Sequence, residues 1–246
     1  MPDPIVDNPR LAEIYDALDP DRSDLDVYAA MVDEFGARSV LDIGCGTGTF
    51  ACMLAQRGFD VTGVDPAAAS LDVARTKSGA ERVRWIRGDA TTLPRLHVDL
   101  AVMTANVAQV FLTDEAWMAT LQGILEALRP AGRLIFEARD PARRAWEDWT
   151  RAKSFVRVDI PGIGVVESWD QVTAVDGPLV TFGGETTFES DGAVVTSRST
   201  LRFRDREEIT GSLQASEFRV VEVRDAPDRP GREFVVVAAT IAGRAD

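Results

Sequence analysis

Three glycines alternate with small residues directly after a short apolar run near residue 40. The run Val40-Leu41-Asp42-Ile43 leads into Gly44, Gly46 and Gly48, and helical spacing begins at the last glycine. Glycine lets a backbone turn tightly and approach a ligand, and the helix N-terminus behind it offers unpaired N–H groups. Asp65 ends the next apolar run, 21 residues after Gly44, where a carboxylate can accept both hydroxyl protons of a ribose. These features predict a site for a nucleoside-containing ligand.

The spacing of the glycines separates two kinds of nucleoside site. The dinucleotide fingerprint G-x-G-x-x-G requires a glycine at position 49, where this chain has Thr49. The observed spacing is G-x-G-x-G, with Asp42 two residues before the first glycine, and a further acid, Asp89, follows a third apolar run. Acids at the ends of successive parallel strands would surround the crevice where open α/β sheets bind ligands. The spacing therefore disfavours a dinucleotide-dependent oxidoreductase.

Short apolar runs alternate with helical stretches around these acids. Helical spacing covers residues 8–36 and is broken at Pro20. We then expect strands at 40–43, 60–64, 83–87, 99–104 and 133–138, and helices at 48–57, 67–78 and 114–128. This order predicts parallel βαβ units with helices on both faces of one sheet.

The pattern changes between residues 142 and 205, where helical spacing disappears. Residues 154–159, 163–174, 178–189 and 193–204 are rich in Val, Thr, Phe and Trp, and the dipeptides at 176–177 and 191–192 are Asp-Gly hairpin signals. A helix at 206–217 and strands at 219–224 and 233–240 follow. We predict an α/β, Rossmann-like doubly wound sheet of seven strands with the last pair antiparallel, plus a small antiparallel β insert.

The chain is accordingly divided into four segments. They are the N-terminal helices (1–36), the core (37–141), the antiparallel insert as a lid or dimer element (142–205), and the closing helix and strand pair (206–246).

With these residues in place, the chain resembles the class I S-adenosylmethionine (SAM)-dependent methyltransferases. The matching motifs are Leu41-Asp42-Ile43-Gly44-Cys45-Gly46-Thr47-Gly48, Val61-Thr62-Gly63-Val64-Asp65, Gly88-Asp89-Ala90 and Leu128-Arg129-Pro130-Ala131-Gly132-Arg133-Leu134. The position of the insert after the fifth strand is similar to that in small-molecule methyltransferases of this family, including those acting on amino sugars. The resemblance implies SAM as cofactor and methyl transfer to nitrogen or oxygen of a small molecule.

The resemblance also implies roles for individual residues. The three glycines would pass beneath the methionine part of SAM, Asp42 would position its ammonium group, Asp65 the ribose hydroxyls, and Asp89 with the Ala90 amide the adenine. The full expected cofactor set is Asp42, Gly44, Cys45, Gly46, Gly48, Asp65, Pro66, Asp89, Ala90 and Asn106. Structural alternatives stay open, because each of the three acids can instead cap a turn or a helix N-terminus.

Acceptor-side residues are expected after the fourth and fifth strands and on the first helix. Asn106 and Gln109 are the polar residues after the fourth strand, Glu137 ends the fifth, and Tyr15 could close over the cofactor. Asn106, Tyr15 and Glu137 are therefore the catalytic candidates, with turn formation, core packing and salt bridging as their respective alternatives. His97, the only histidine, precedes the fourth strand and is expected at the surface, far from the crevice. No clustered metal-ligand spacing is present, so no metal site is expected.

Composition restricts the acceptor. The 246 residues carry 27 Lys plus Arg against 40 Asp plus Glu, a formal net charge of −13. Such a surface repels the phosphate backbone, so nucleic acid is an unfavourable partner. Two cysteines, an acidic N-terminus and the lack of a long apolar stretch predict a cytoplasmic protein without a membrane partner. We expect a small-molecule acceptor and a monomer or homodimer.

Two other functions stay open at this point. A SAM-binding protein without transfer activity would need the same glycine loop, because the loop reports cofactor binding and not chemistry. An NAD-dependent oxidoreductase is disfavoured by Thr49 and by the expected antiparallel strand pair at the C-terminus.

Overall fold

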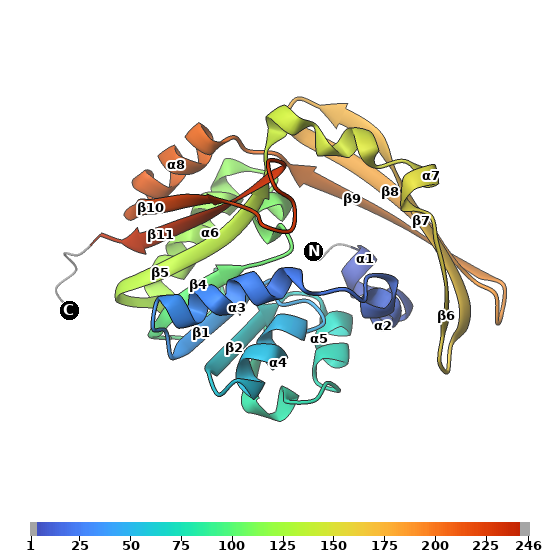
Figure 1. Ribbon diagram of the computed structural model, residues 1–246, viewed down its shortest axis with the longest axis horizontal. Coiled ribbons are helices and arrows are strands. Elements are labelled where there is room, and N and C mark those ends of the chain that lie inside the picture. Colours follow the sequence, from blue (N-terminus) through green and yellow to red (C-terminus); the bar gives the residue numbers. More distant parts are fainter. Residues whose placement is uncertain (1–3, 242–246) are drawn as a thin grey trace.

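The computed structural model describes residues 4–241, which form two β-sheets with helices packed against them (Figure 1). The larger sheet contains β1 (Ser39–Ile43), β2 (Asp60–Asp65), β3 (Val83–Arg87), β4 (Val98–Met103), β5 (Leu128–Arg139), β10 (Phe218–Asp225) and β11 (Glu233–Thr240). The smaller contains β6 (Val156–Ile160), β7 (Gly164–Asp176), β8 (Leu179–Phe188) and β9 (Ala193–Arg202). The helices are α1 (Pro4–Asp7), α2 (Pro9–Leu18), α3 (Asp24–Glu34), α4 (Thr49–Gln56), α5 (Ala68–Ala74), α6 (Asp114–Ala127), α7 (Arg151–Ser154) and α8 (Arg206–Ala215).

The seven-stranded sheet has the order β10-β11-β5-β4-β1-β2-β3. The first five strands along the chain pair in parallel, and β11 is antiparallel to both β5 and β10. Strand order reverses between β1 and β4, and ligands of open α/β sheets bind outside the strand ends at such a point. The predicted Rossmann-like sheet with an antiparallel last pair is therefore confirmed.

Apolar side chains cover both faces of this sheet. One core cluster joins β4, β5 and β11 to α6 and α8 through Trp117, Phe136 and Phe234, and the other joins β1 and β2 to α3 and α4 through Val40, Phe50 and Leu54. Burial of both faces explains why the parallel strands have almost continuous apolar sequences.

The segment 142–205 forms the predicted antiparallel insert, a sheet of order β6-β7-β8-β9. Three short helical stretches precede it: η3 (Pro141–Arg143), η4 (Ala145–Asp148) and α7. Trp149 packs edge-on against Phe182 of β8, and Trp146 packs edge-on against Phe203. The tryptophans after the fifth strand therefore fasten the connecting segment to the insert.

Two expected boundaries differ from the structure by more than two residues. The helix expected at 67–78 ends at Ala74, because turns and the short helix η1 (Ala80–Arg82) follow, with Gly79 at φ +87°. Strand β5 begins at Leu128 and not at 133, since residues 129–132 form an irregular start in which Ala131 has φ +64° and the register with β4 shifts. The four-segment division of the chain stays a prediction.

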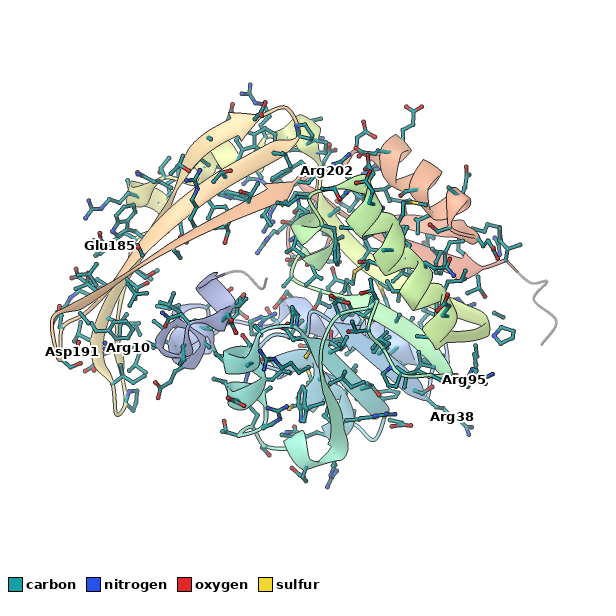
Figure 2. All side chains as sticks on the ribbon, turned by 180° about the vertical axis from the view of Figure 1, so that it is seen from behind. Arg10, Arg38, Arg95, Glu185, Asp191 and Arg202 are labelled. Carbon is teal, nitrogen blue, oxygen red and sulfur yellow. The ribbon has the colours of Figure 1, made fainter. Side chains whose placement is uncertain are left out.

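Helix α2 packs against the insert. Leu11 and Ile14 form a small core with Ile160, Val166 and Phe188 of the insert. On the same side, Arg10 donates to the Asp191 carboxylate (2.9 Å) and lies 3.8 Å from the centre of the Phe188 ring (Figure 2). Because the ion pair is largely exposed, the buried apolar contacts carry most of this attachment.

Replacement of Ile14 by alanine tests this attachment. Ile14 is fully buried, so we expect Ile14→Ala to lower the free energy of unfolding by about 2–5 kcal/mol, through lost transfer free energy and a residual cavity. Urea unfolding would measure the change. Val194→Ala, at a position 54% exposed on the same insert, is the control and should change stability by less than about 0.5 kcal/mol. Equal effects of the two variants would show that α2 is not held by this core.

Candidate active site

The glycine loop leaves β1 and opens toward solvent at Gly46. A side chain at Gly44 would overlap Val107, since a Cβ there would lie 2.7 Å from that side chain, whereas a Cβ at Gly46 would meet nothing within 4 Å. Both residues have positive φ, +69° and +52°, a conformation that favours glycine. Gly48 precedes the N-terminus of α4. The backbone at Gly46 thus leaves room that a side chain would fill, as a ligand cradle requires.

Asp42 is buried at the end of β1 without a hydrogen bond. Its residue is 1% exposed, and neither carboxylate oxygen has a partner among residues 4–241. Burial, followed by repulsion from Asp65, raises its pKa to about 7, and the charge of Arg22 and the nearby amide of Ala51 oppose this. A buried carboxylate without a partner is costly, so a cationic group beside it would be strongly stabilised.

Asp65 closes the glycine loop from the neighbouring strand. One carboxylate oxygen accepts from the Gly46 amide and the other from the Ala67 amide, both at 2.8 Å. Burial raises its pKa, and these two hydrogen bonds act in the opposite direction. Asp65 thus stabilises the turn before α5, whose N-cap is Ala67, and each of its oxygens keeps a further lone pair for a ribose hydroxyl.

The remaining expected cofactor residues lie around the same edge of the sheet. Asp89 is exposed and accepts from the Thr91 amide (2.9 Å) and hydroxyl (2.6 Å), so it stabilises its own turn. Ala90 is buried, Pro66 is exposed and Cys45 is half-buried. Burial raises the pKa of the Cys45 thiol, which argues against a nucleophilic role.

Asp16 connects α2 to the glycine loop. Its carboxylate accepts from the Thr47 hydroxyl (2.7 Å) and forms an ion pair with Nζ of Lys77 (2.5 Å). Lys77 in turn donates to the Thr49 hydroxyl (2.6 Å). The same helix that packs on the insert is therefore also bound to the loop that follows β1.

Tyr15 and Arg22 bring a phenol and a cation to this region. Tyr15 is 39% exposed. Desolvation raises the pKa of its hydroxyl, and the charges of Arg22 and Arg139 oppose the increase. Arg22 is held by Asp24 through two hydrogen bonds of 3.2 and 3.3 Å. Its charge also acts on Asp42, so it is a basic group close to the buried carboxylate.

A strained turn after β4 presents Asn106. Ala105 and Asn106 both have positive φ, +54° and +61°, and such strain is commonly retained where a site needs it. The Asn106 amide N–H donates to Glu137 Oε1 (2.9 Å), and the Tyr28 hydroxyl of α3 makes a short hydrogen bond to Glu137 Oε2. Burial raises the pKa of Glu137, while the Tyr28 hydrogen bond lowers it. Both oxygens of Glu137 are thus engaged in holding the turn.

The Asn106 side chain belongs to a further buried network. Its Nδ2 donates to Glu233 Oε2 (3.0 Å), which leaves Oδ1 buried and without a hydrogen bond among the described residues. Glu233 also pairs with Arg229 (2.7 Å) and Arg139 (3.4 Å), and Arg139 donates to Gln109 Oε1 (2.9 Å). An amide oxygen without a partner is suited to accept an N–H or O–H group of an acceptor molecule.

Several of these residues were missed at the level of sequence. Tyr28 fits the apolar face of its helix, so a core role is the natural interpretation. Glu233 carried a usable signal, because a charged residue opens an otherwise apolar strand that starts at the edge where β5 ends. Arg22 carried none. His97 is exposed just before β4, at the opposite edge of the sheet, as expected.

Metal-ligand clusters and membrane-spanning helices are both absent from the part of the chain that the structure describes. Residues 4–241 contain no cluster of three or more His, Cys, Asp or Glu side chains that could hold a metal ion. Over the same range, no helix is long and apolar enough to cross a membrane.

Part of the chain is similar in sequence to known methyltransferases. Residues 40–132 match the family model described as a methyltransferase domain. A curated relative, the cypemycin N-terminal methyltransferase of a Streptomyces species, is 32% identical over 146 residues, which cover 58% of this chain and 60% of the relative. The chain spans about half the length of the curated relatives it matches, 60% and 42% for the first two.

Solved structures match over nearly the whole chain. A SAM-dependent methyltransferase from Clostridium acetobutylicum has a TM-score of 0.74 at 17% identity, covering 95% of this chain and 98% of that one. CalS10, an amino pentose methyltransferase from Micromonospora echinaspora determined with SAM bound, has a TM-score of 0.73 at 22% identity, covering 92% and 96%. The resemblance to class I SAM-dependent methyltransferases is confirmed, and CalS10 holds SAM, the cofactor that this resemblance implies.

The raised pKa of Asp42 predicts a pH dependence of stability. The folded-state pKa of about 7 lies above the usual value of 3.8, so the folded protein binds this proton more tightly than the unfolded chain. The resulting stabilisation is complete below pH 4 and is lost as the pH rises through 7. Asp42→Asn, which cannot ionise, should therefore gain about 2–3 kcal/mol relative to the wild type between pH 5 and pH 8 in cofactor-free protein.

Urea unfolding at the two pH values measures this difference. Asp60→Asn removes an exposed carboxylate at the start of β2 and is the control. A stability difference between Asp42→Asn and wild type that is the same at both pH values would show that the Asp42 carboxylate is already compensated in the folded protein.

Proposed function

We propose that this protein transfers a methyl group from SAM to nitrogen or oxygen of a small molecule. The observation that carries the proposal is the buried, unpartnered carboxylate of Asp42 beside the open turn at Gly46. SAM would supply an electrophilic methyl group on a sulfonium centre. Its ammonium group would compensate the Asp42 carboxylate, and burial makes that attraction stronger than it would be in water.

Roles for the other cofactor-side residues follow from their positions. Asp65 would accept the ribose hydroxyl protons on its free lone pairs, and Asp89 with the Ala90 amide would contact the adenine. Arg22, whose charge already acts on Asp42, would bind the carboxylate of the methionine part. Thr47 and Thr49 would hold the loop to α2 through Asp16 and Lys77.

Asn106 is the acceptor-side residue that the geometry favours most. Methyl transfer is a displacement at carbon, so orientation of the attacking lone pair contributes much of the rate. Asn106 Oδ1 would accept an N–H or O–H of the acceptor and turn its lone pair toward the methyl group. Glu137 would act through Asn106 as a positioning residue, since both of its oxygens are already engaged. Tyr15 would cover the reacting groups from α2.

The methyl group could be transferred to a nitrogen or to an oxygen atom of the acceptor. The name of the cypemycin N-terminal methyltransferase indicates transfer to an amine, and CalS10 is named as an amino pentose methyltransferase. These names favour nitrogen over oxygen. The net charge of −13 favours a neutral or cationic acceptor over a polyanion. A cytoplasmic location and a monomer or homodimer remain part of the proposal.

Calorimetric titration with SAM tests the cofactor assignment. We expect micromolar binding of SAM, none of NADH, and a roughly 10- to 100-fold weaker affinity for Asp65→Asn, since hydrogen bonds to a charged group are lost. Asp60→Asn, exposed at the start of the same strand, is the matched control and should bind as the wild type does. Absence of SAM binding by folded wild-type protein would overturn the proposal.

Single-turnover transfer separates an enzyme from a protein that only binds SAM. The cofactor-loaded protein would be mixed with amines and alcohols, and methylated product would be detected by mass spectrometry. Asn106→Gly keeps the positive φ and removes the side-chain amide, so we expect at least a 10-fold slower transfer with SAM affinity unchanged within about threefold. Transfer to no acceptor, despite tight SAM binding, would favour the binding protein.

A further inference from the structure

A small cavity lies beside the segment that follows Asn106, with Ala108 and Gln109 in its lining. It is formed where the end of β9, α6, α8 and the short helix η2 (Val107–Val110) meet, and its volume is about 10 Å³. The apolar part of the lining includes Trp117, Ala138 and Ile209. Such a volume holds one particle of about the size of a water molecule. Arg202, which lines it, is seen in Figure 2 beside the N-terminal end of α6.

The polar lining consists of Gln109, Arg202 and Arg204. The amide orientation of Gln109 is fixed, because its Oε1 accepts from Nη1 of Arg139 at 2.9 Å. Its Nε2 is therefore the remaining group, and it is buried without a hydrogen-bond partner among residues 4–241. Gln109 and Arg204 are 2% and 3% exposed, so neither can turn to bulk solvent.

The two arginines add donors that are also unpartnered. Nη1 and Nε of Arg204 and Nε of Arg202 are buried and make no hydrogen bond with the described residues. Nη2 of Arg204 donates to the Thr113 carbonyl (3.2 Å), and its Nε lies 3.5 Å from Glu208 Oε1.

Two acids lie near this arginine pair, and both are closer to Arg202 than to Arg204. Asp114 and Glu208 lie 2.8 and 2.5 Å from Nη2 of Arg202, which also donates from Nη1 to the Leu112 carbonyl (3.2 Å). Asp114 is 3.8 Å from Arg204. Burial and the charge of Arg202 lower the pKa of Arg204 to about 10. Arg204 is thus the less compensated cation.

A water molecule and a small anion both fit this volume, and the hydrogen-bond donors of the lining favour one of them. A water molecule accepts hydrogen bonds but also has two protons to donate, and every unpartnered side-chain polar atom of the lining is a donor. An anion accepts from every side and compensates a buried cation. We propose that this cavity is a binding site for a small monovalent anion, with chloride as the physiological ion, held by Gln109, Arg202 and Arg204.

The site lies at a junction of the fold. Gln109 joins it to Arg139 and thereby to the network around Glu233, while Arg202 ends β9, the last strand of the insert, and Arg204 lies two residues beyond. A bound anion would fix the Gln109 amide and hold the end of β9 against α6. Its expected effect is on stability, and it does not depend on the proposed methyl transfer.

Diffraction from crystals of the full chain grown in bromide locates the ion directly. We expect one anomalous peak in the cavity, within hydrogen-bonding reach of Gln109 Nε2 and Arg204, and weaker occupancy for the larger iodide. In parallel, the Tm is measured while chloride replaces gluconate at constant ionic strength. Chloride at about tenfold its Kd should raise the Tm by roughly 3–6 °C.

The Gln109→Glu variant places a carboxylate in the cavity, where it takes the place of the bound anion. The new carboxylate keeps one oxygen for Arg139 and places the other where Nε2 was, facing the arginines. We expect this variant to bind no bromide in the cavity and to have a Tm independent of chloride. Arg157→Gln, at an exposed arginine paired with Glu167 and Glu189 on the insert, is the control and should keep the chloride dependence.

Each result is decisive for the proposal. A bromide peak together with a chloride-dependent Tm that Gln109→Glu abolishes supports the site. A cavity without an anomalous peak, or a chloride effect of equal size in wild type and Gln109→Glu, overturns it. A peak without any chloride effect on the Tm shows an adventitious ion only and also overturns it. The diffraction result on wild-type protein stands even if the variant fails to fold.

Discussion

A carboxylate buried without a hydrogen bond is the constraint from which the organisation of this site follows. Asp42 lies at the central strand, where strand order reverses, and burial there raises its pKa to about 7. The surroundings offer only partial compensation through Arg22 and through the first turn of α4. The surroundings of Asp42 therefore favour a positively charged ligand, which would compensate the buried carboxylate.

On the acceptor side, in contrast, the buried carboxylates have partners within the protein. Glu233 is paired with two arginines, and Glu137 is engaged by Tyr28 and by the backbone of Asn106. The two carboxylates therefore act as supports. They hold a turn in a conformation that alanine and asparagine seldom adopt, and they leave one amide oxygen available.

The sequence predicts the site residues whose positions follow from strand order. It does not predict the residues that reach the site through side-chain packing. Gly44 and Asp65 could be placed together because parallel strands bring their carboxyl ends to one edge. Tyr28 and Arg22 could not, because a tyrosine on an apolar helix face and an arginine in a polar turn look alike whether or not they face a site. The shift of β5 to Leu128 had the same origin: Pro130 and Gly132 favour a stop, and pairing with β4 overrides it.

Helix α2 has a consequence for the timing of ligand exchange. One of its faces is fixed to the insert by Ile14 and Leu11, and Asp16 is fixed to the glycine loop. A ligand held beneath such a helix leaves only when those contacts break together, so its residence time is governed by the opening frequency of the N-terminal segment. Affinity and dissociation rate then depend on different residues, and evolution can adjust the lifetime of the bound state without altering the groups that recognise the ligand.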